Sequence, residues 1–191
     1  MALEFYGRLE RSPHSLSQRI LRAIWGVVWW IFFRPSPRVC HAWRRFLLRC
    51  FGGRIAHDAH IFPTTRIWAP WNLTMGRSST LSYDVDCYCV APITLCEYAI
   101  VAQYCYLCTA THDFEQRGRP VVSKPIIIGA GAWVCAQVFI GPGVVVGEGA
   151  VVGARAAVFK DVEPWTVVGG NPSRFIRMRK KPGDSREVTS I

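Results

Sequence analysis

Aliphatic residues recur at every sixth position in the C-terminal half of the chain. The run consists of Ile128, Val134, Ile140, Val146, Val152 and Val158, and glycine follows four of them. An α-helix needs apolar residues at i, i+3, i+4 and i+7, and a half-buried strand needs strict alternation. A period of six fits neither pattern and indicates one short strand and one corner per repeat. The pattern therefore predicts an all-β solenoid of hexapeptide repeats.

Three such repeats would close one triangular coil of about eighteen residues. The aliphatic residue is expected to point into the prism and to stack on its equivalent in the next coil. The residue after it is expected to be small or to adopt positive φ, because the chain bends there.

The same spacing occurs earlier in the chain, with interruptions. Its members are Ile55, Ile61, Ile67 and Leu73, then Leu81 and Cys87 after a slip of two residues, then Leu95, Val101 and Leu107 after a second slip. A longer break follows Leu107, and residues 109–125 are expected to form a loop that projects from a corner. Inserts in solenoids usually become loops at corners, and loops often carry function.

These boundaries divide the chain into three segments. Residues 1–54 are an N-terminal helical or amphipathic segment, residues 55–177 are the β-helix, and residues 178–191 are a flexible basic tail.

The N-terminal segment contains an uncharged run, residues 23–33 (AIWGVVWWIFF), preceded by Arg19 and Arg22. Eleven residues are too few to cross a bilayer, which needs about twenty. Pro35 and Pro37 should end this helix, and residues 41–51 read as a second, basic amphipathic helix. The two helices either pack on the solenoid or a neighbouring subunit, or make peripheral membrane contact through residues 19–51. The two interpretations are compatible.

The chain has 191 residues and a net charge of +10, with a pI near 9.6. Basic proteins attract anions, but no nucleic-acid-binding motif occurs here, so we expect a phosphate-rich ligand or a membrane surface rather than nucleic acid.

Several of the eight cysteines occupy ladder positions, where cysteine behaves as a small hydrophobic residue. Cys105 and Cys108 have the spacing of a metal or redox pair, but no second pair accompanies them. Reduced thiols suit a cytoplasmic protein.

His112 lies at the start of the projecting loop. Because histidine titrates near neutrality, it can take a proton from a hydroxyl that attacks a carbonyl. His57 and His60 are three residues apart, but no further metal ligands accompany them, so we interpret both as surface residues.

Five stretches of sequence carry a resemblance to a known family. They are residues 33–38 (FRPSPR), 66–74 (RIWAPWNLT), 106–113 (YLCTATHD), 125–129 (PIIIG) and 167–172 (VVGGNP). On these stretches the chain resembles the hexapeptide-repeat O-acetyltransferases, which include the maltose, galactoside and Nod-factor enzymes. Within that family it looks most similar to the colanic acid biosynthesis acetyltransferase group.

The resemblance implies a left-handed parallel β-helix that forms a homotrimer with active sites between adjacent prisms. It also implies that His112 is the general base for direct transfer of acetyl from acetyl-CoA to a sugar hydroxyl, with no metal required. The acceptor is expected to be a glycan of exopolysaccharide synthesis, with lipid-linked intermediates included. The implied location is the cytoplasm, with the inner membrane as a peripheral contact.

The same resemblance assigns binding residues. Trp133 matches a tryptophan of the acceptor and thioester region, with a merely exposed aromatic as the alternative. Ala136 and Ala154 match positions along the pantetheine arm. Three cations match residues near the CoA phosphates, with solvated surface charge as the alternative: Lys160, Arg174 and Arg177.

One departure concerns the asparagine that sugar acetyltransferases place opposite the histidine, one coil earlier. An ungapped count from His112 reaches Ser82, with Asp84 and Asp86 close by. We expect Ser82 and Asp84 to contact the acceptor, although a plain turn role for Asp84 fits equally well.

Two other functions compete with acetyl transfer. A non-catalytic β-helix scaffold would have no acetyl-CoA site. A metal-dependent enzyme of the γ-carbonic anhydrase kind would need three histidines on neighbouring coils, and after Phe62 the chain has only His112.

Overall fold

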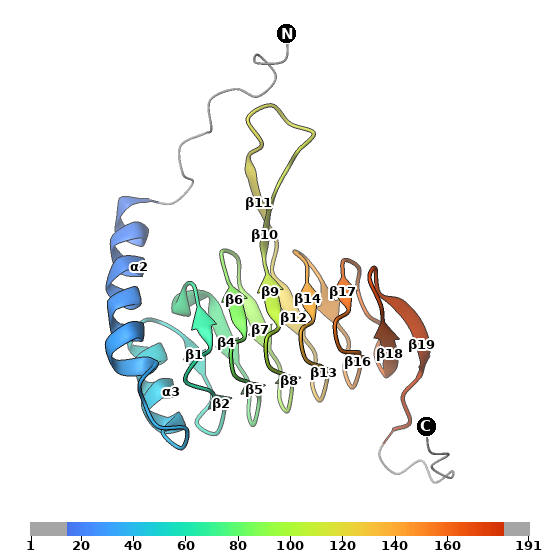
Figure 1. Cartoon of the computed structure of the whole chain (residues 1–191), viewed down its shortest axis with the longest axis horizontal. Helices are drawn as coiled ribbons and strands as arrows, with labels where there is room; N and C mark the ends of the chain where they lie inside the picture. The colour runs from blue at the N-terminus through green and yellow to red at the C-terminus, as the bar shows by residue number, and fades with distance from the viewer. Residues whose placement is uncertain (1–14, 182–191) are drawn as a thin grey trace.

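A computed structural model describes residues 15–181, and residues 1–14 and 182–191 lie outside the described part of the chain. Most of the predicted C-terminal tail therefore lies outside it. The remaining residues form a long triangular prism with two helices at its N-terminal end and one hairpin projecting from its side (Figure 1). The predicted fold class, a hexapeptide-repeat parallel β-helix with an N-terminal helical segment and a projecting loop, is confirmed.

Three parallel sheets form the faces of the prism. Sheet A contains β1 (Arg54–Ile55), β4 (Leu73–Met75), β7 (Ile93–Leu95), β12 (Ile126–Ile128) and β15 (Val145–Val146). Sheet B contains β2 (His60–Ile61), β5 (Thr80–Leu81), β8 (Ile100–Val101), β13 (Trp133–Val134), β16 (Val151–Val152) and β18 (Thr166–Gly169), and it ends in the antiparallel strand β19 (Arg174–Met178). Sheet C contains β3 (Arg66–Ile67), β6 (Asp86–Tyr88), β9 (Tyr106–Cys108), β14 (Phe139–Ile140) and β17 (Ala157–Val158).

The core is the stacked ladder that the spacing predicts. All six residues of the run from Ile128 to Val158 are completely buried. Within a sheet they lie in register with their equivalents one coil away; for example, Ile128 pairs with Val146. Burial of these aliphatic side chains is the main favourable contribution to folding.

The residue after each inward-facing aliphatic residue is small for a different reason from the one expected. A Cβ added at Gly129 would lie 2.7 Å from the backbone of the next coil, and one added at Gly147 would lie 2.5 Å from Pro164. Neither glycine has positive φ; the left-handed conformation comes two positions later, at Gly131 and Gly149. The slot is therefore small because adjacent coils approach closely there, and the bend lies beyond it.

The first slip in the ladder lies one corner earlier than the sequence suggests. Register pairs Ile55 with Met75, whereas Leu73 pairs with Ile93. The interval of eight residues therefore separates Ile67 from Met75. All three interruptions of the ladder consequently fall at the corner between sheets C and A, which we call the C/A corner.

The N-terminal segment forms α2 (Leu16–Val28), a π-helical turn η1 (Trp29–Phe33) and α3 (His41–Cys50). Ser15 caps α2 by accepting a hydrogen bond from the Gln18 amide. Trp25, Phe33 and Leu48 are buried and join the core of the prism. The helices thus pack on the solenoid, as one of the two sequence interpretations holds. Within residues 15–181, no helix combines the length and the apolar character that a membrane crossing would need.

The first coil has an open edge that the helices close. In the second coil, five carbonyl groups accept hydrogen bonds from amides of the first coil: those of Met75, Ser79, Leu81, Val85 and Cys87. The equivalent carbonyls of the first coil, twenty residues earlier, have no preceding coil to pair with. An unpaired row of this kind costs free energy when buried and invites pairing with another chain.

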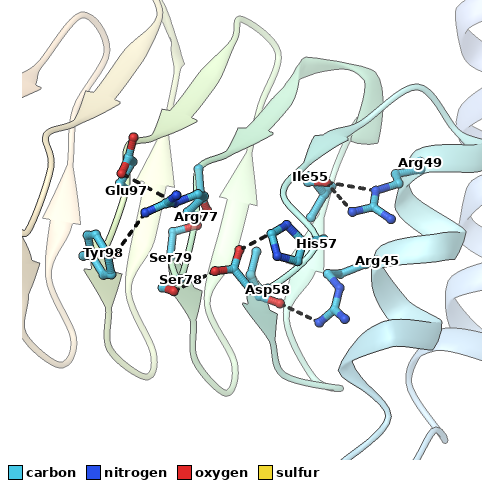
Figure 2. A network of polar contacts seen from close by, with 12 residues as sticks. Arg45, Arg49, Ile55, His57, Asp58, Arg77, Ser78, Ser79, Glu97 and Tyr98 are labelled. Carbon is cyan, nitrogen blue, oxygen red and sulfur yellow. Dashed lines mark hydrogen bonds and ion pairs between the residues drawn. The ribbon is translucent and has the colours of Figure 1, made fainter.

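Side chains of the helices bind all five of these carbonyl oxygens. The Arg49 guanidinium donates to the Ile55 carbonyl at 2.6 and 2.9 Å, and Arg45 donates to the Ala59 carbonyl at 3.0 Å. Figure 2 shows these two arginines reaching from α3 to the first coil.

The other three carbonyls are bound in the same way. Arg44 donates to the Ile61 carbonyl at 2.6 Å, and His41 Nδ1 lies 2.9 Å from the same oxygen. The indole N–H groups of Trp29 and Trp25 donate to the carbonyls of Thr65 and Ile67, at 2.8 and 2.6 Å.

Arg44 has the largest share in this cap. Its side chain is completely buried. Besides the Ile61 carbonyl, it donates to the Ser36 hydroxyl and to the carbonyls of Pro37 and Arg38. Arg44 therefore holds both the open edge and the turn between the two helices.

Replacement of Arg44 by methionine should lower the free energy of unfolding by about 3 kcal/mol, because it leaves several buried carbonyl groups unsatisfied. Urea denaturation followed by circular dichroism measures this. Arg19→Met is the control: Arg19 is exposed on α2, and its replacement should change stability by less than about 0.5 kcal/mol. Equal stability of the two variants would contradict the capping role.

Candidate functional site

The predicted catalytic residue lies on the projecting hairpin. β10 (Ala110–His112) and β11 (Val121–Ser123) pair antiparallel, with His112 opposite Val121. The hairpin leaves the prism at the C/A corner, between β9 and β12 (Figure 1). His112 is therefore exposed at the rim of the prism, clear of the core.

The root of the hairpin is fixed to the coil below. The Thr109 hydroxyl donates to the Tyr88 carbonyl at 2.7 Å and accepts from the Ala91 amide at 3.0 Å. Thr109 is completely buried, and its own carbonyl accepts from the Lys124 amide. This attachment positions the first strand of the hairpin relative to sheet C.

The hydrogen bond of His112 sets its tautomer. Nδ1 lies 2.7 Å from the carbonyl oxygen of Arg119. Because a carbonyl oxygen only accepts, Nδ1 must carry the proton. In the neutral ring Nε2 is then unprotonated, and its lone pair can accept a proton from a substrate hydroxyl.

Trp133 lies on the opposite side of the prism. It is on the outer face of sheet B, 48% exposed, between Ile100 and Val151 in the register of the sheet. Sheet B is the face opposite the C/A corner of a triangular prism. A single copy of the chain therefore does not bring Trp133 and His112 together.

Ala136 and Ala154 lie at the corner between sheets B and C, in turns one coil apart. The Arg155 amide donates to the Ala136 carbonyl at 3.0 Å, which holds these turns in register. Ala136 is half-buried and Ala154 is exposed.

Two of the three predicted phosphate-binding cations lie together. Lys160 and Arg174 both line a groove of about 240 Å³ at the C-terminal end, together with Asp161 and Glu163. Arg177 lies on β19, paired with Val167, and is not among the residues of this groove.

Ser82 and Asp84 lie at the B/C corner, in a groove with Tyr83 and Tyr104. Asp84 has φ of 54° and its amide donates to the Thr64 hydroxyl, so it is a turn residue. The ungapped count from His112 to Ser82 covers thirty residues, whereas one coil here advances by twenty, as the pairing of Cys87 with Leu107 shows, so the count ends at a different corner. Within one chain, the structure therefore does not place Ser82 or Asp84 opposite His112.

The register instead places Asp86 next to the strand that leads into the hairpin. Asp86 pairs with Tyr106 across sheet C. Burial raises the pKa of the Asp86 carboxyl above its ordinary value of 3.8, and the nearby Arg66 charge opposes the shift. From the sequence alone there was no basis for preferring Asp86 to Asp84, because both lie between the ladder residues Leu81 and Cys87.

Asp86 lines a groove of about 470 Å³ between α2 and the outer face of sheet C. Arg22 and Arg66 are the other charged residues that line this groove. Its aromatic lining residues are Trp25, Trp29, Trp30, Trp68 and Tyr88. The Arg22 guanidinium lies 4.1 Å from the centre of the Trp68 ring.

Aromatic rings continue from this groove along the outer face of sheet C. Neighbouring rings are 5.5 to 6.3 Å apart, in the order Trp68, Tyr88, Tyr106, Phe139 and Phe159. Each ring comes directly before or after an inward-facing ladder residue. An aromatic residue next to an inward-facing ladder residue is therefore the sequence signal from which this surface can be found.

The cysteines and possible metal ligands also bear on the site. All eight cysteines are free, and Cys105 and Cys108 are buried. In the part of the chain that the structure describes, no three His, Cys, Asp or Glu side chains gather in a way that could hold a metal ion.

The sequence of this chain is similar to that of a known acetyltransferase. No protein-family model matches the chain. A protein of Escherichia coli (strain K12) assigned as colanic acid biosynthesis acetyltransferase WcaF is 40% identical over 156 residues, which cover 82% of this chain and 86% of that protein.

Solved structures give the same relationship. A hexapeptide-repeat-containing acetyltransferase from Vibrio cholerae O1 biovar eltor, complexed with acetyl coenzyme A, superposes with a TM-score of 0.79 at 27% identity, over 95% of this chain and 100% of that one. A galactoside acetyltransferase in complex with coenzyme A shares the fold, with a TM-score of 0.80 at 24% identity over 88% and 86% of the two chains. The chain therefore belongs to the hexapeptide-repeat acetyltransferases, in the group of the colanic acid biosynthesis acetyltransferase WcaF.

Proposed function

We propose that this protein is an O-acetyltransferase that moves acetyl from acetyl-CoA to a sugar hydroxyl, with His112 as general base. The observation that carries the proposal is the hydrogen bond from His112 Nδ1 to the Arg119 carbonyl, which leaves Nε2 free to accept a proton. The exposed position of His112 at the prism rim leaves room for two substrates to meet there.

In the proposed reaction, Nε2 takes the proton of the acceptor hydroxyl as its oxygen bonds to the thioester carbonyl carbon. The tetrahedral intermediate collapses, the carbon–sulfur bond breaks, and the CoA thiolate leaves. The imidazolium then returns the proton to the thiolate. A positioned base of this kind contributes about 10²- to 10⁴-fold to the rate.

The separation of residues within one chain supports a site shared between copies. Trp133 and the alanine corner occupy one side of the prism, and His112 projects from the other. If all of them contact one thioester, then the histidine of one copy must face the tryptophan of the next. We therefore retain the homotrimer that the family resemblance implies, with Lys160 and Arg174 at the CoA phosphates.

We place the acceptor in the groove between α2 and sheet C. Its aromatic rings suit the apolar faces of sugar rings, and the Asp86 carboxylate suits sugar hydroxyls. Arg22 and Arg66 suit an anionic group on the acceptor, such as a phosphate. Since the WcaF relative is assigned to colanic acid biosynthesis, an exopolysaccharide precursor is the acceptor class we propose. Free cysteines fit a cytoplasmic protein.

His112→Ala should lower kcat for acetyl transfer by about 10²- to 10⁴-fold while acetyl-CoA affinity stays within about twofold. Thiol release from acetyl-CoA in the presence of acceptor glycans measures the rate, and calorimetry measures the affinity. His57→Ala, at an exposed turn between sheets A and B, is the matched control. Unchanged turnover in His112→Ala would remove the base from the proposal.

Mixed oligomers test the shared site. His112→Ala and Trp133→Ala should each be impaired alone, but co-assembled chains should regain activity, because some interfaces then combine the intact histidine of one copy with the intact tryptophan of another. In a trimer formed from equal amounts, about one quarter of the interfaces do so. Activity of the mixture equal to the average of the two pure variants would show instead that both residues act within one copy.

Asp86 gives a pH-dependent prediction. The ionised carboxylate accepts hydrogen bonds from acceptor hydroxyls, so the acceptor KM should rise as the pH falls through the raised pKa of Asp86. Asp86→Asn should raise this KM at neutral pH and remove the acid dependence, with acetyl-CoA affinity unchanged. Asp84→Asn at the B/C corner is the comparison variant. If the acceptor KM changes in Asp84→Asn and not in Asp86→Asn, the acceptor binds at the B/C corner, as the count from His112 in the sequence predicts.

A further inference from the structure

The helix formed by α2 and the π-helical turn η1 that continues it has two apolar sides, and only one of them contacts the prism. Trp25 and Trp29 occupy the inner side, where they bind the open edge of the first coil. The outer side carries five large aliphatic residues that are between 50% and 69% exposed: Leu16, Ile20, Ile24, Val27 and Ile31. Their spacings of four, four, three and four residues place them along one side of a helix.

This exposed surface continues onto the neighbouring helix. Phe32 is 51% exposed, and its carbonyl accepts a hydrogen bond from the Trp43 indole at 2.9 Å. The Trp43 ring stacks on Phe46, and both side chains are exposed. We call these eight residues, from Leu16 to Phe46, the apolar end face. It lies at the N-terminal end of the prism, at the opposite end from β19 (Figure 1).

The charge around the apolar end face has one sign. Residues 15–50 contain seven arginines and no aspartate or glutamate. Three of the arginines, Arg44, Arg45 and Arg49, cap the first coil. The other four remain at or near the surface of α2 and of the turn that follows it: Arg19, Arg22, Arg34 and Arg38.

We propose that the apolar end face docks on an anionic lipid bilayer. An amphipathic helix with aliphatic and tryptophan side chains on one side, bordered by arginines, lies in the plane of the headgroups and is attracted by acidic lipids. A second copy of the same face is a poor occupant, because it would bring seven further arginines against these without any carboxylate. The charge complementarity therefore favours an acidic lipid surface.

Docking would also place the acceptor groove beside the bilayer. Arg22, Gly26 and Trp30 of the helical segment form one wall of that groove, and Arg66 and Asp86 form the other. An acceptor with a lipid tail and a phosphate-bearing sugar could therefore remain in the membrane while its sugar enters the groove. This last step rests on the proposed function, whereas the docking itself does not.

Vesicle sedimentation with the full-length protein tests the docking. The protein should sediment with phosphatidylcholine vesicles that contain phosphatidylglycerol, and less with phosphatidylcholine alone. The double variant Ile20→Ser/Ile24→Ser should bind at least about tenfold more weakly, because binding scales with the apolar area that enters the interface. Ile176→Ser/Met178→Ser is the control: these residues are 60% and 58% exposed on β19, at the other end of the prism, and should not affect vesicle binding.

Three outcomes would overturn the proposal. The wild type fails to sediment with acidic vesicles, the Ile20→Ser/Ile24→Ser variant sediments as well as the wild type, or that variant changes the oligomeric state in light scattering, which would identify the face as an interface between copies. Acetyl-CoA binding, measured by calorimetry on the same proteins, separates the two proposals. Its retention without vesicle binding would reject the docking alone, and its absence with vesicle binding retained would reject the proposed function alone.

Discussion

The fold depends on satisfying the backbone groups at the open edge of the first coil. A parallel β-helix passes its hydrogen bonds from coil to coil, so an isolated first coil would leave five ladder carbonyls unpaired. Here three arginine and two tryptophan side chains of the N-terminal helices bind those oxygens, with His41 beside one of them. The helices thus take the place of a preceding coil. A carboxylate at the position of Arg44, Arg45 or Arg49 would face a carbonyl oxygen without a proton to donate, which accounts physically for the cationic side chains at these three positions.

The sequence predicts the prism and the helices, but not the way in which the helices cap the first coil. The hexapeptide spacing from Ile128 to Val158 predicts the prism because only one geometry buries every sixth side chain. The helices were also predictable as helices, from Pro35 and Pro37 and from the apolar runs. Their capping function was not predictable, because it depends on which carbonyl oxygens face Arg44 and Trp25 in three dimensions.

The prediction of the site was limited because the sequence does not show which strands pair across the coils. His112 could be recognised from its loop and from the family motif. Asp86 could not be distinguished from Asp84, because both lie between the ladder residues Leu81 and Cys87, and only the pairing of Asp86 with Tyr106 places it beside the strand that leads to His112. Trp133 and His112 are 21 residues apart in sequence, yet they lie on opposite sides of the prism. Only the triangular cross-section shows that they belong to different sides.

The closed first coil also constrains how such a protein can change in length. Because side chains rather than backbone groups satisfy its edge, another coil cannot be added in front of it without discarding the helices and every contact that they make. The antiparallel strand β19 covers the far end of sheet B in a comparable way. Whole turns can therefore be gained or lost only in the middle of the prism, where each coil resembles its neighbours. The solenoid acts as an adjustable spacer between two fixed ends, so evolution or design could alter the separation of the helices from the C-terminal groove in steps of one coil.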